Sequence, residues 1–294
     1  MNVLVTGGTG FIGQAVVLEL ESAGHRVTVL TRQNPPAVLR RLYVKQLQDI
    51  PAGTRFQAII NLAGESMAGK RWTSAYKDLL SHSRINTTKE LVNYINSLEN
   101  PPEVLLSASA VGYYGHHREQ PLAEGSVVVP GFSAQLCQRW EAEAMRAQTA
   151  ATRVCLLRLG VVLDRGGGAV TEMRKSFNFG IASWMGNGRQ WLSWIHRRDV
   201  VRGIMFLLGR ADLQGPYNLT APEPVTGRGF SDGLRQHMST FMTLPLPGVL
   251  LRVLLGEMAQ ELLLNGQRVL PARLQQGGFS FDYPTLDKAL EAII

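Results

Sequence analysis

Short apolar runs alternate with helical spacing over the first half of this 294-residue chain. Short runs of mainly aliphatic and β-branched residues predict buried strands at 2–6, 26–31, 57–62, 103–109 and 153–163. Apolar residues at helical spacing predict helices at 13–23, 73–98 and 133–147. Because such alternation is typical of parallel strands joined by right-handed crossovers, we predict an α/β Rossmann fold with a doubly wound parallel sheet.

The pattern changes after Leu163. A Gly166-Gly167-Gly168 turn is followed by tryptophans and a proline-rich stretch at 216–224, and helical spacing returns at 249–264 and from 285 onward. We predict a Rossmann domain over 1–165 and a smaller C-terminal α+β substrate lobe over 166–294, parts of which can return to the first domain.

The composition limits the classes of partner. Hydrophobic residues make up 45% of the chain, which carries a formal net charge of +7. Its Lys and Arg residues are scattered, with neither a basic helix nor an aromatic RNA-reading motif, so we predict no nucleic-acid partner. Two explanations of the charge stay open, a groove for an anionic cofactor or substrate and an ordinary solvated surface.

Signals for secretion, membrane insertion and metal binding are absent from the sequence. The strand after Met1 is not a signal peptide, and the most apolar later stretch is interrupted by Arg252, Glu257 and Glu261. Cys137 and Cys155 lack the spacing of metal ligands or of a disulfide framework. We expect a cytoplasmic protein without a membrane or metal partner, and a homodimer is left open.

A glycine-rich turn joins the first predicted strand to the first predicted helix. Gly7 permits a tight turn, Gly10 lets backbone amides approach a pyrophosphate, and Gly13 lets the helix lie close to the sheet. Because a strand precedes the motif and a helix follows it, the motif predicts a dinucleotide site, with a glycine-rich turn that binds no ligand as the alternative. The residues assigned to it are Gly7, Thr9, Gly10, Phe11, Ile12 and Gly13.

The end of the second strand predicts which dinucleotide binds. NAD-selective sites usually place Asp or Glu there to accept the ribose hydroxyls. This strand ends in Thr31-Arg32, and a guanidinium suits the 2′-phosphate of NADP(H). We predict NADP(H) as the cofactor, with a solvated loop cation as the alternative role of Arg32.

Three further segments carry a family resemblance. They are Asn61-Leu62-Ala63-Gly64, the run from Ser107 to Gly115, and Trp194-Ile195-His196-Arg197-Arg198-Asp199. With the glycine motif, they resemble the extended short-chain dehydrogenase/reductase superfamily in order and spacing along nearly the whole chain. The sequence is most similar to its atypical epimerase family proteins, whose C-terminal lobe ends in a stretch like the one at 265–271.

The resemblance implies positions around the cofactor. Asn61, Leu62, Ala63 and Gly64 are expected under the adenosine and ribose, and Gly160 and Val161 near the nicotinamide. Arg84 stands where typical members have Asn, so it is expected to add a cationic contact, with an ordinary helix-surface cation as the alternative.

Two residues after the tryptophans have less certain roles. We expect Asp199 to cap the helix that follows it. His196 is expected either to line the substrate pocket or to be a hydrogen-bonded structural residue.

The usual catalytic pair of that superfamily is missing. Typical members carry Tyr-x-x-x-Lys on a helix, whereas Phe132 and Leu136 stand at those places here. A phenyl ring cannot exchange a proton. Ser109, Tyr113 and Tyr114 remain as candidate proton donors, with packing or lid roles as the alternative for the two tyrosines.

Two functional classes follow. One is an NADP(H)-dependent oxidoreductase or epimerase-like enzyme that acts on a small-molecule substrate through a nonstandard proton relay. The other is a noncatalytic NADP(H)-binding redox sensor or interaction protein.

Overall fold

The computed structural model describes residues 1–38 and 41–294, without the side chains of 169, 172, 173 and 175. A seven-stranded, fully parallel sheet in the order β3-β2-β1-β4-β5-β7-β12 forms its centre, which confirms the predicted Rossmann fold. Its strands are β1 (Asn2–Thr6), β2 (Arg26–Leu30), β3 (Arg41–Val44), β4 (Ala58–Asn61), β5 (Val104–Ala110), β7 (Arg153–Leu159) and β12 (Gly215–Leu219).

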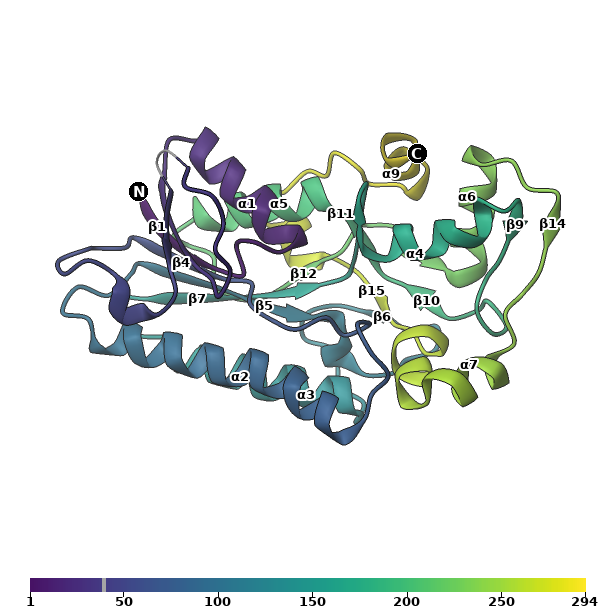
Figure 1. Ribbon diagram of the computed structural model, residues 1–294, viewed down its shortest axis with the longest axis horizontal. Coiled ribbons are helices and arrows are strands. Elements are labelled where there is room, and N and C mark those ends of the chain that lie inside the picture. Colours follow the sequence, from purple (N-terminus) through teal and green to yellow (C-terminus); the bar gives the residue numbers. More distant parts are fainter. Residues whose placement is uncertain (39–40) are drawn as a thin grey trace.

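Helices cover both faces of the sheet (Figure 1). The helices α1 (Phe11–Ser22) and α5 (Arg197–Leu208) lie on one face, and α2 (Ser74–Ser97) and α3 (Phe132–Met145) lie on the other. Side chains of a strand alternate between the two cores, because successive residues of a strand point to opposite faces. In β1, Val3 and Val5 pack under α1 and α5, whereas Leu4 packs under α2 and α3.

The C-terminal half of the chain contributes to both parts of the molecule. Its helices α5 and α8 (Ala272–Gln276) and its strand β12 pack in the Rossmann layers, and most of the remainder forms a lobe beyond the carboxyl edge of the sheet (Figure 1). The lobe contains α4 (Gly168–Phe177), α6 (Gly227–His237), α7 (Gly248–Leu255), α9 (Leu286–Ile293) and short strands, among them β8 (Val161–Asp164), β9 (Ile181–Ala182), β11 (Trp194–His196) and β14 (Met242–Thr243). No helix in the described part of the chain is long and apolar enough to cross a membrane.

Two segments predicted as single elements are divided by glycines. The strand predicted at 153–163 breaks at Gly160, whose amide donates a hydrogen bond to Leu219 O at 3.0 Å. A side chain at Gly160 would lie 2.5 Å from Ser193 O, so only glycine fits this crossing point. The helix predicted at 249–264 ends at Gly256, which has a φ of +63°. A short π-helix, η3 (Ala259–Leu264), follows it.

The expected cap at Asp199 was wrong. The helix α5 begins at Arg197, two residues before Asp199. Its N-cap is His196, whose Nδ1 accepts a hydrogen bond from the amide of Arg198 at 3.1 Å. Burial lowers the pKa of His196, which keeps the imidazole neutral and able to accept this bond. Asp199 instead accepts from the amides of Asp282 and Tyr283, both at 2.9 Å, and so holds the C-terminal segment against α5.

Candidate cofactor cleft and reaction end

A cleft of about 440 Å³ opens at the carboxyl edge of the sheet, beside β1, β2 and β4. Open α/β sheets bind ligands at this edge, where the strand order reverses on either side of β1. The described residues that line the cleft are Thr6, Gly7, Thr9, Gly10, Leu30, Thr31, Arg32, Gln33, Lys45, Leu62, Ala63, Gly64, Glu65, Ser83, Thr87 and Glu90.

The three motif glycines have different surroundings. Gly7 has a φ of +69°, and a Cβ there would lie 2.5 Å from Leu62 O. A Cβ on Gly13 would lie 2.1 Å from Gly7 O, so the first turn of α1 packs directly on the glycine loop. Gly10 borders the cleft, and among the described atoms only Gly7 O lies within 4 Å of an added Cβ there, at 3.3 Å. Gly7 and Gly13 therefore shape the turn, while Gly10 leaves space for a ligand.

The amino end of α1 offers backbone donors at the cleft. Gly10 is the N-cap and has no side-chain hydrogen bond to the helix. The amides of the first turn of a helix have no partner within that helix, and together with the helix dipole they favour an anion. Phe11 and Ile12 contribute through this backbone; the Phe11 ring itself packs at Gly167, against the C-terminal lobe.

Two cations stand at the outer end of the cleft. Arg32 follows β2, and Lys45 follows β3, the neighbouring strand. Both side chains are exposed, and neither has a carboxylate partner among the described residues. Thr31 lies beside them, with its hydroxyl 3.4 Å from that of Thr9. This end of the cleft suits a doubly charged phosphate group.

The far wall of the cleft is a loop held from below. Leu62, Ala63 and Gly64 line the cleft, whereas Asn61 is buried beneath them. Asn61 accepts from the Thr6 hydroxyl at 2.6 Å and donates to that of Thr88 at 2.8 Å. Its amide therefore joins the ends of β1 and β4 to α2.

Arg84 supports the same loop. It is 9% exposed and is not among the described residues that line the cleft. Its guanidinium donates to Glu65 O at 2.8 Å and to Leu80 O at 3.1 Å, and burial lowers its pKa. Instead of the expected direct contact with the cofactor, Arg84 makes hydrogen bonds to backbone carbonyls, which hold the loop at residues 64 and 65 in place.

The sequence analysis missed several lining residues. Ser83, Thr87 and Glu90 form one polar face of α2, as helical spacing of three to four residues would have indicated. Lys45 had no such signal, because β3 was not predicted and its position depends on pairing with β2.

Gly160 and Val161 lie where the chain leaves the sheet. Their amides donate to Leu219 O at 3.0 Å and to Ser193 O at 2.8 Å. Neither residue lines the described cleft, and both fix the crossing from β7 into the lobe.

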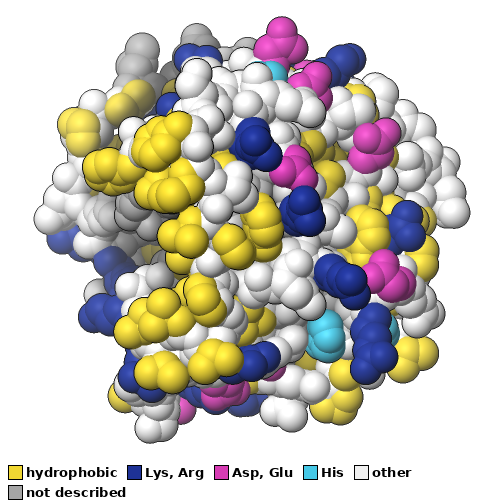
Figure 2. Space-filling view, turned by 90° about the vertical axis from the view of Figure 1, so that its right-hand side faces the viewer, with side chains coloured by type: hydrophobic (Ala, Val, Ile, Leu, Met, Phe, Trp, Pro, Cys, Tyr) yellow, Lys and Arg dark blue, Asp and Glu magenta, His cyan; other side chains and the backbone are white. Residues whose placement is uncertain are grey.

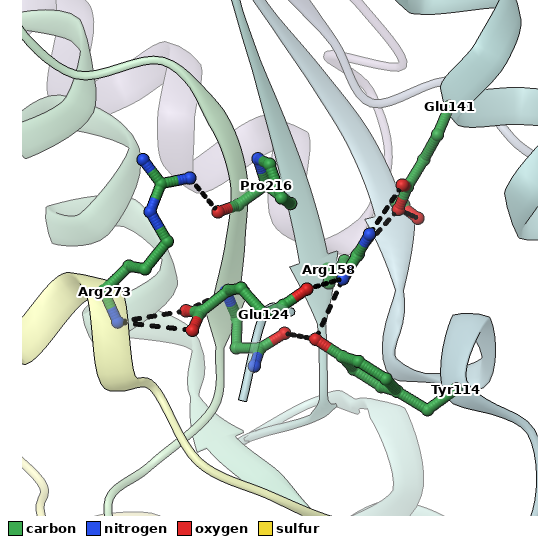
Figure 3. Close-up of polar contacts among 8 residues, drawn as sticks. Tyr114, Glu124, Glu141, Arg158, Pro216 and Arg273 are labelled. Atoms are coloured by element: carbon green, nitrogen blue, oxygen red, sulfur yellow. Dashed lines mark hydrogen bonds and ion pairs between the residues drawn. The ribbon is translucent and has the colours of Figure 1, made fainter. Parts of the chain in front are cut away.

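A buried polar network lies beyond β5 (Figure 3). Arg158 on β7 makes a two-pronged ion pair with Glu141 on α3, with nitrogen–oxygen distances of 2.8 and 2.9 Å. Arg158 also donates to the Tyr114 hydroxyl at 3.0 Å. That hydroxyl in turn donates to Asn218 on β12 at 2.6 Å.

The network continues into the C-terminal half of the chain. Arg158 donates to Glu124 O at 2.9 Å, and the Glu124 carboxylate accepts from the amides of Asn218 and Arg273, at 3.0 and 3.2 Å (Figure 3). The Arg273 guanidinium donates to Pro216 O at 2.7 Å. These contacts tie β7, β12 and α8 together in the interior.

Two of the three candidate proton donors belong to this network. Tyr114 is completely buried, and burial raises its pKa to about 12, so we correct the expectation that it meets a substrate. Ser109 is 1% exposed and donates to Glu141 at 2.6 Å. Both hydroxyls already have partners, and their described contacts are structural.

Tyr113 differs from its neighbour. It is half-buried, and its hydroxyl has no hydrogen-bond partner in the described part of the chain. The Arg158 guanidinium carbon lies 3.5 Å from the centre of its ring, which fixes the ring by a cation–π contact. Of the three candidates, Tyr113 alone keeps a free hydroxyl.

The places of the missing catalytic pair are apolar. Phe132 packs edge-to-face on Trp72, with 5.0 Å between ring centres. Leu136 is buried in the same cluster with Leu80 and Met258. The start of α3 therefore contributes packing between the Rossmann domain and the lobe.

The parallel sheet, its strand order and the cleft beside β1 define an α/β protein with a Rossmann-type dinucleotide fold. Residues 3–220 match the NAD dependent epimerase/dehydratase family, and residues 246–293 match a domain of unknown function, DUF1731. The chain belongs to the NAD dependent epimerase/dehydratase family, as the sequence resemblance predicts.

Relatives match over almost their whole lengths. An epimerase family protein of Mycobacterium leprae is 38% identical over 291 residues, covering 98% of this chain and 94% of the relative. One of Staphylococcus aureus is 34% identical over 296 residues, covering 99% and 98%. The crystal structure of human epimerase family protein SDR39U1 with NADPH has a TM-score of 0.90 at 32% identity, covering 100% of this chain and 99% of that one.

Proposed function

We propose that this protein binds NADP(H) and acts as an oxidoreductase or epimerase-like enzyme on a small-molecule substrate. The observation that carries the proposal is a pair of cations, Arg32 and Lys45, at the outer end of the cleft, neither of which has a carboxylate partner among the described residues. The amino end of α1, which no side chain caps, borders the same cleft. The NADPH in the similar human structure supports the choice of cofactor.

The residues around the cleft have separate tasks in this proposal. The amides of α1 bind the pyrophosphate, and Leu62, Ala63 and Gly64 support the adenosine half. Bound nicotinamide supplies or accepts a hydride. Tyr113 holds the proton at its hydroxyl, because the other two candidate hydroxyls are engaged in the interior.

A specific observation favours a second function. Phe132 and Leu136 cannot transfer protons, and Ser109 and Tyr114 already have buried partners. A protein that binds NADP(H) without turnover, as a redox sensor or interaction protein, needs the cleft but no proton relay. This second function shares every cofactor contact with the first.

NADPH is expected to bind more tightly than NADH, with Arg32 and Lys45 as the cause. Removing a charged hydrogen bond costs about 1.5–3 kcal/mol, so Arg32→Ala and Lys45→Ala should each weaken NADPH binding roughly 10- to 100-fold. NADH affinity should stay the same, because it lacks the 2′-phosphate. Isothermal titration calorimetry measures both.

Arg26→Ala is the matched control for these variants, since Arg26 is an exposed arginine at the opposite end of β2. It should leave NADPH affinity unchanged. Equal affinity of the unmodified protein for NADPH and NADH would contradict the assignment of the 2′-phosphate to this end of the cleft.

Turnover separates the enzyme from the sensor. We expect NADPH oxidation with some member of a broad panel of aldehydes and ketones, and a loss of about 100-fold in single-turnover rate for Tyr113→Phe, the usual scale of a general acid. Cofactor affinity should not change in that variant. Tight NADPH binding without oxidation by any carbonyl compound would favour the sensor.

A further inference from the structure

Apolar side chains gather on one side of the outer end of the C-terminal lobe, away from the sheet (Figure 2). Phe241 is 82% exposed and Phe179 is 76% exposed, and Val253 on α7 is 68% exposed. Soluble monomers rarely expose large apolar side chains together. We call these residues the end surface: Phe179, Phe241, Met242, Leu244, Val249, Leu250, Val253 and Leu254.

Backbone hydrogen bonds hold the end surface in place. β14 pairs with β9, and beyond it the amides of Leu244 and Leu246 donate to Ala182 O and Trp184 O, at 2.9 and 2.8 Å. The helix α7 follows directly and buries only Leu251 of its apolar side chains. The ordered backbone therefore presents these side chains outward.

Charge around the end surface is positive. Within residues 239–255, Arg252 is the single charged residue. Arg252 and Arg189 are exposed and have no carboxylate partner among the described residues. Of the acids on neighbouring elements, Glu257 pairs with Lys77, and Asp232 pairs with Arg228 and Arg235. Glu261 on η3 faces inward and accepts from the amide of Ser133 at 3.3 Å.

We propose that the end surface binds the surface of an anionic lipid membrane. Interfacial proteins insert an apolar face into the headgroup region while flanking cations meet anionic headgroups. The chain's net charge of +7 adds long-range attraction to such a surface. The Rossmann domain lies at the opposite end of the molecule, so the cofactor cleft stays open during contact (Figure 1).

A second copy of the chain fits the end surface less well. In a two-fold contact the same patch must supply both partners of every charge pair. Arg252 would then face an apolar patch with no acid in residues 239–255, and two molecules of charge +7 would repel. The proposal differs from the sequence-based expectation of no membrane partner, since that expectation considered only spanning helices and basic segments.

Vesicle sedimentation of the full chain tests the proposal. We expect binding to vesicles of phosphatidylcholine and phosphatidylglycerol in equal parts, and little binding to phosphatidylcholine alone. Val253→Gln and Phe241→Ser should each lower the partition coefficient about tenfold. Leu18→Gln is the matched control, because Leu18 is 59% exposed on α1 and lies outside the end surface.

Circular dichroism of each variant checks that the fold is retained. Failure to sediment with anionic vesicles would overturn the proposal, as would equal binding to both vesicle types. A concentration-dependent dimer that Val253→Gln and Phe241→Ser dissolve would assign the surface to a second copy instead.

Discussion

Replacing Gly10 by valine is expected to remove NADPH binding while the fold remains. Among the described atoms, only Gly7 O lies within 4 Å of a Cβ added at Gly10, at 3.3 Å. The backbone can therefore accommodate the Cβ of valine with a small shift. The two methyl groups then stand in the cleft, where a pyrophosphate must approach the amides of α1. We expect affinity to fall by a factor of about 100 or more, measured by calorimetry.

Two companion variants define the result. Gly125→Val is the control for the effect of a glycine-to-valine change on cofactor affinity, because Gly125 lies outside the cleft. No described atom lies within 4 Å of a Cβ added at Gly125. Gly13→Val should unfold the protein, since its Cβ would lie 2.1 Å from Gly7 O. A folded Gly10→Val protein with normal NADPH affinity would show that the loop has only a structural role.

The glycine turn was predictable because its chemistry is local. Residues 7–13 lie next to one another, and Gly10 and Gly13 both lie against Gly7 O, a few residues away. The close approach of Gly7 to Leu62 O is not local, because it depends on the loop that follows β4. Five strands of the parallel sheet, β1, β2, β4, β5 and β7, were predictable for a similar reason, since each shows as a short, mainly apolar run. The two edge strands β3 and β12 were not predicted, because neither RLYV nor GPYNL forms such a run. The family resemblance added the loop at 61–64, whose cleft-lining residues the structure places beside the glycine turn.

The reaction end was not predictable from local pattern. Tyr114 and Asn218 are 104 positions apart, and Ser109 and Glu141 are 32 apart, so their hydrogen bonds depend on the tertiary fold. A hydroxyl after a strand looks the same in sequence whether it faces a substrate or a buried carboxylate. Burial alone separates Tyr113 from Tyr114, which are neighbours in the chain.

Loss of Arg158 is expected to lower the stability of the folded protein strongly. The side chains of Arg158 and Glu141 are 4% and 7% exposed, so Arg158→Ala would leave a buried carboxylate without its cation. Breaking a buried pair in this way typically costs about 3–5 kcal/mol. For a chain of this length, the melting temperature should fall by roughly 10 °C, measured by calorimetry or circular dichroism.

Two further variants show whether the stability lost in Arg158→Ala comes from breaking the buried ion pair or from removing any arginine. Arg210→Ala breaks an exposed pair with Asp212, which solvent screens, and should change the melting temperature little. The double variant Arg158→Met with Glu141→Leu removes both buried charges, so it should recover much of the stability lost in Arg158→Ala. Tyr114 and Ser109 would still lose a partner, which keeps the recovery incomplete. If Arg158→Ala lowered the melting temperature no more than Arg210→Ala does, the buried network would not be needed to hold β7, α3 and β12 together.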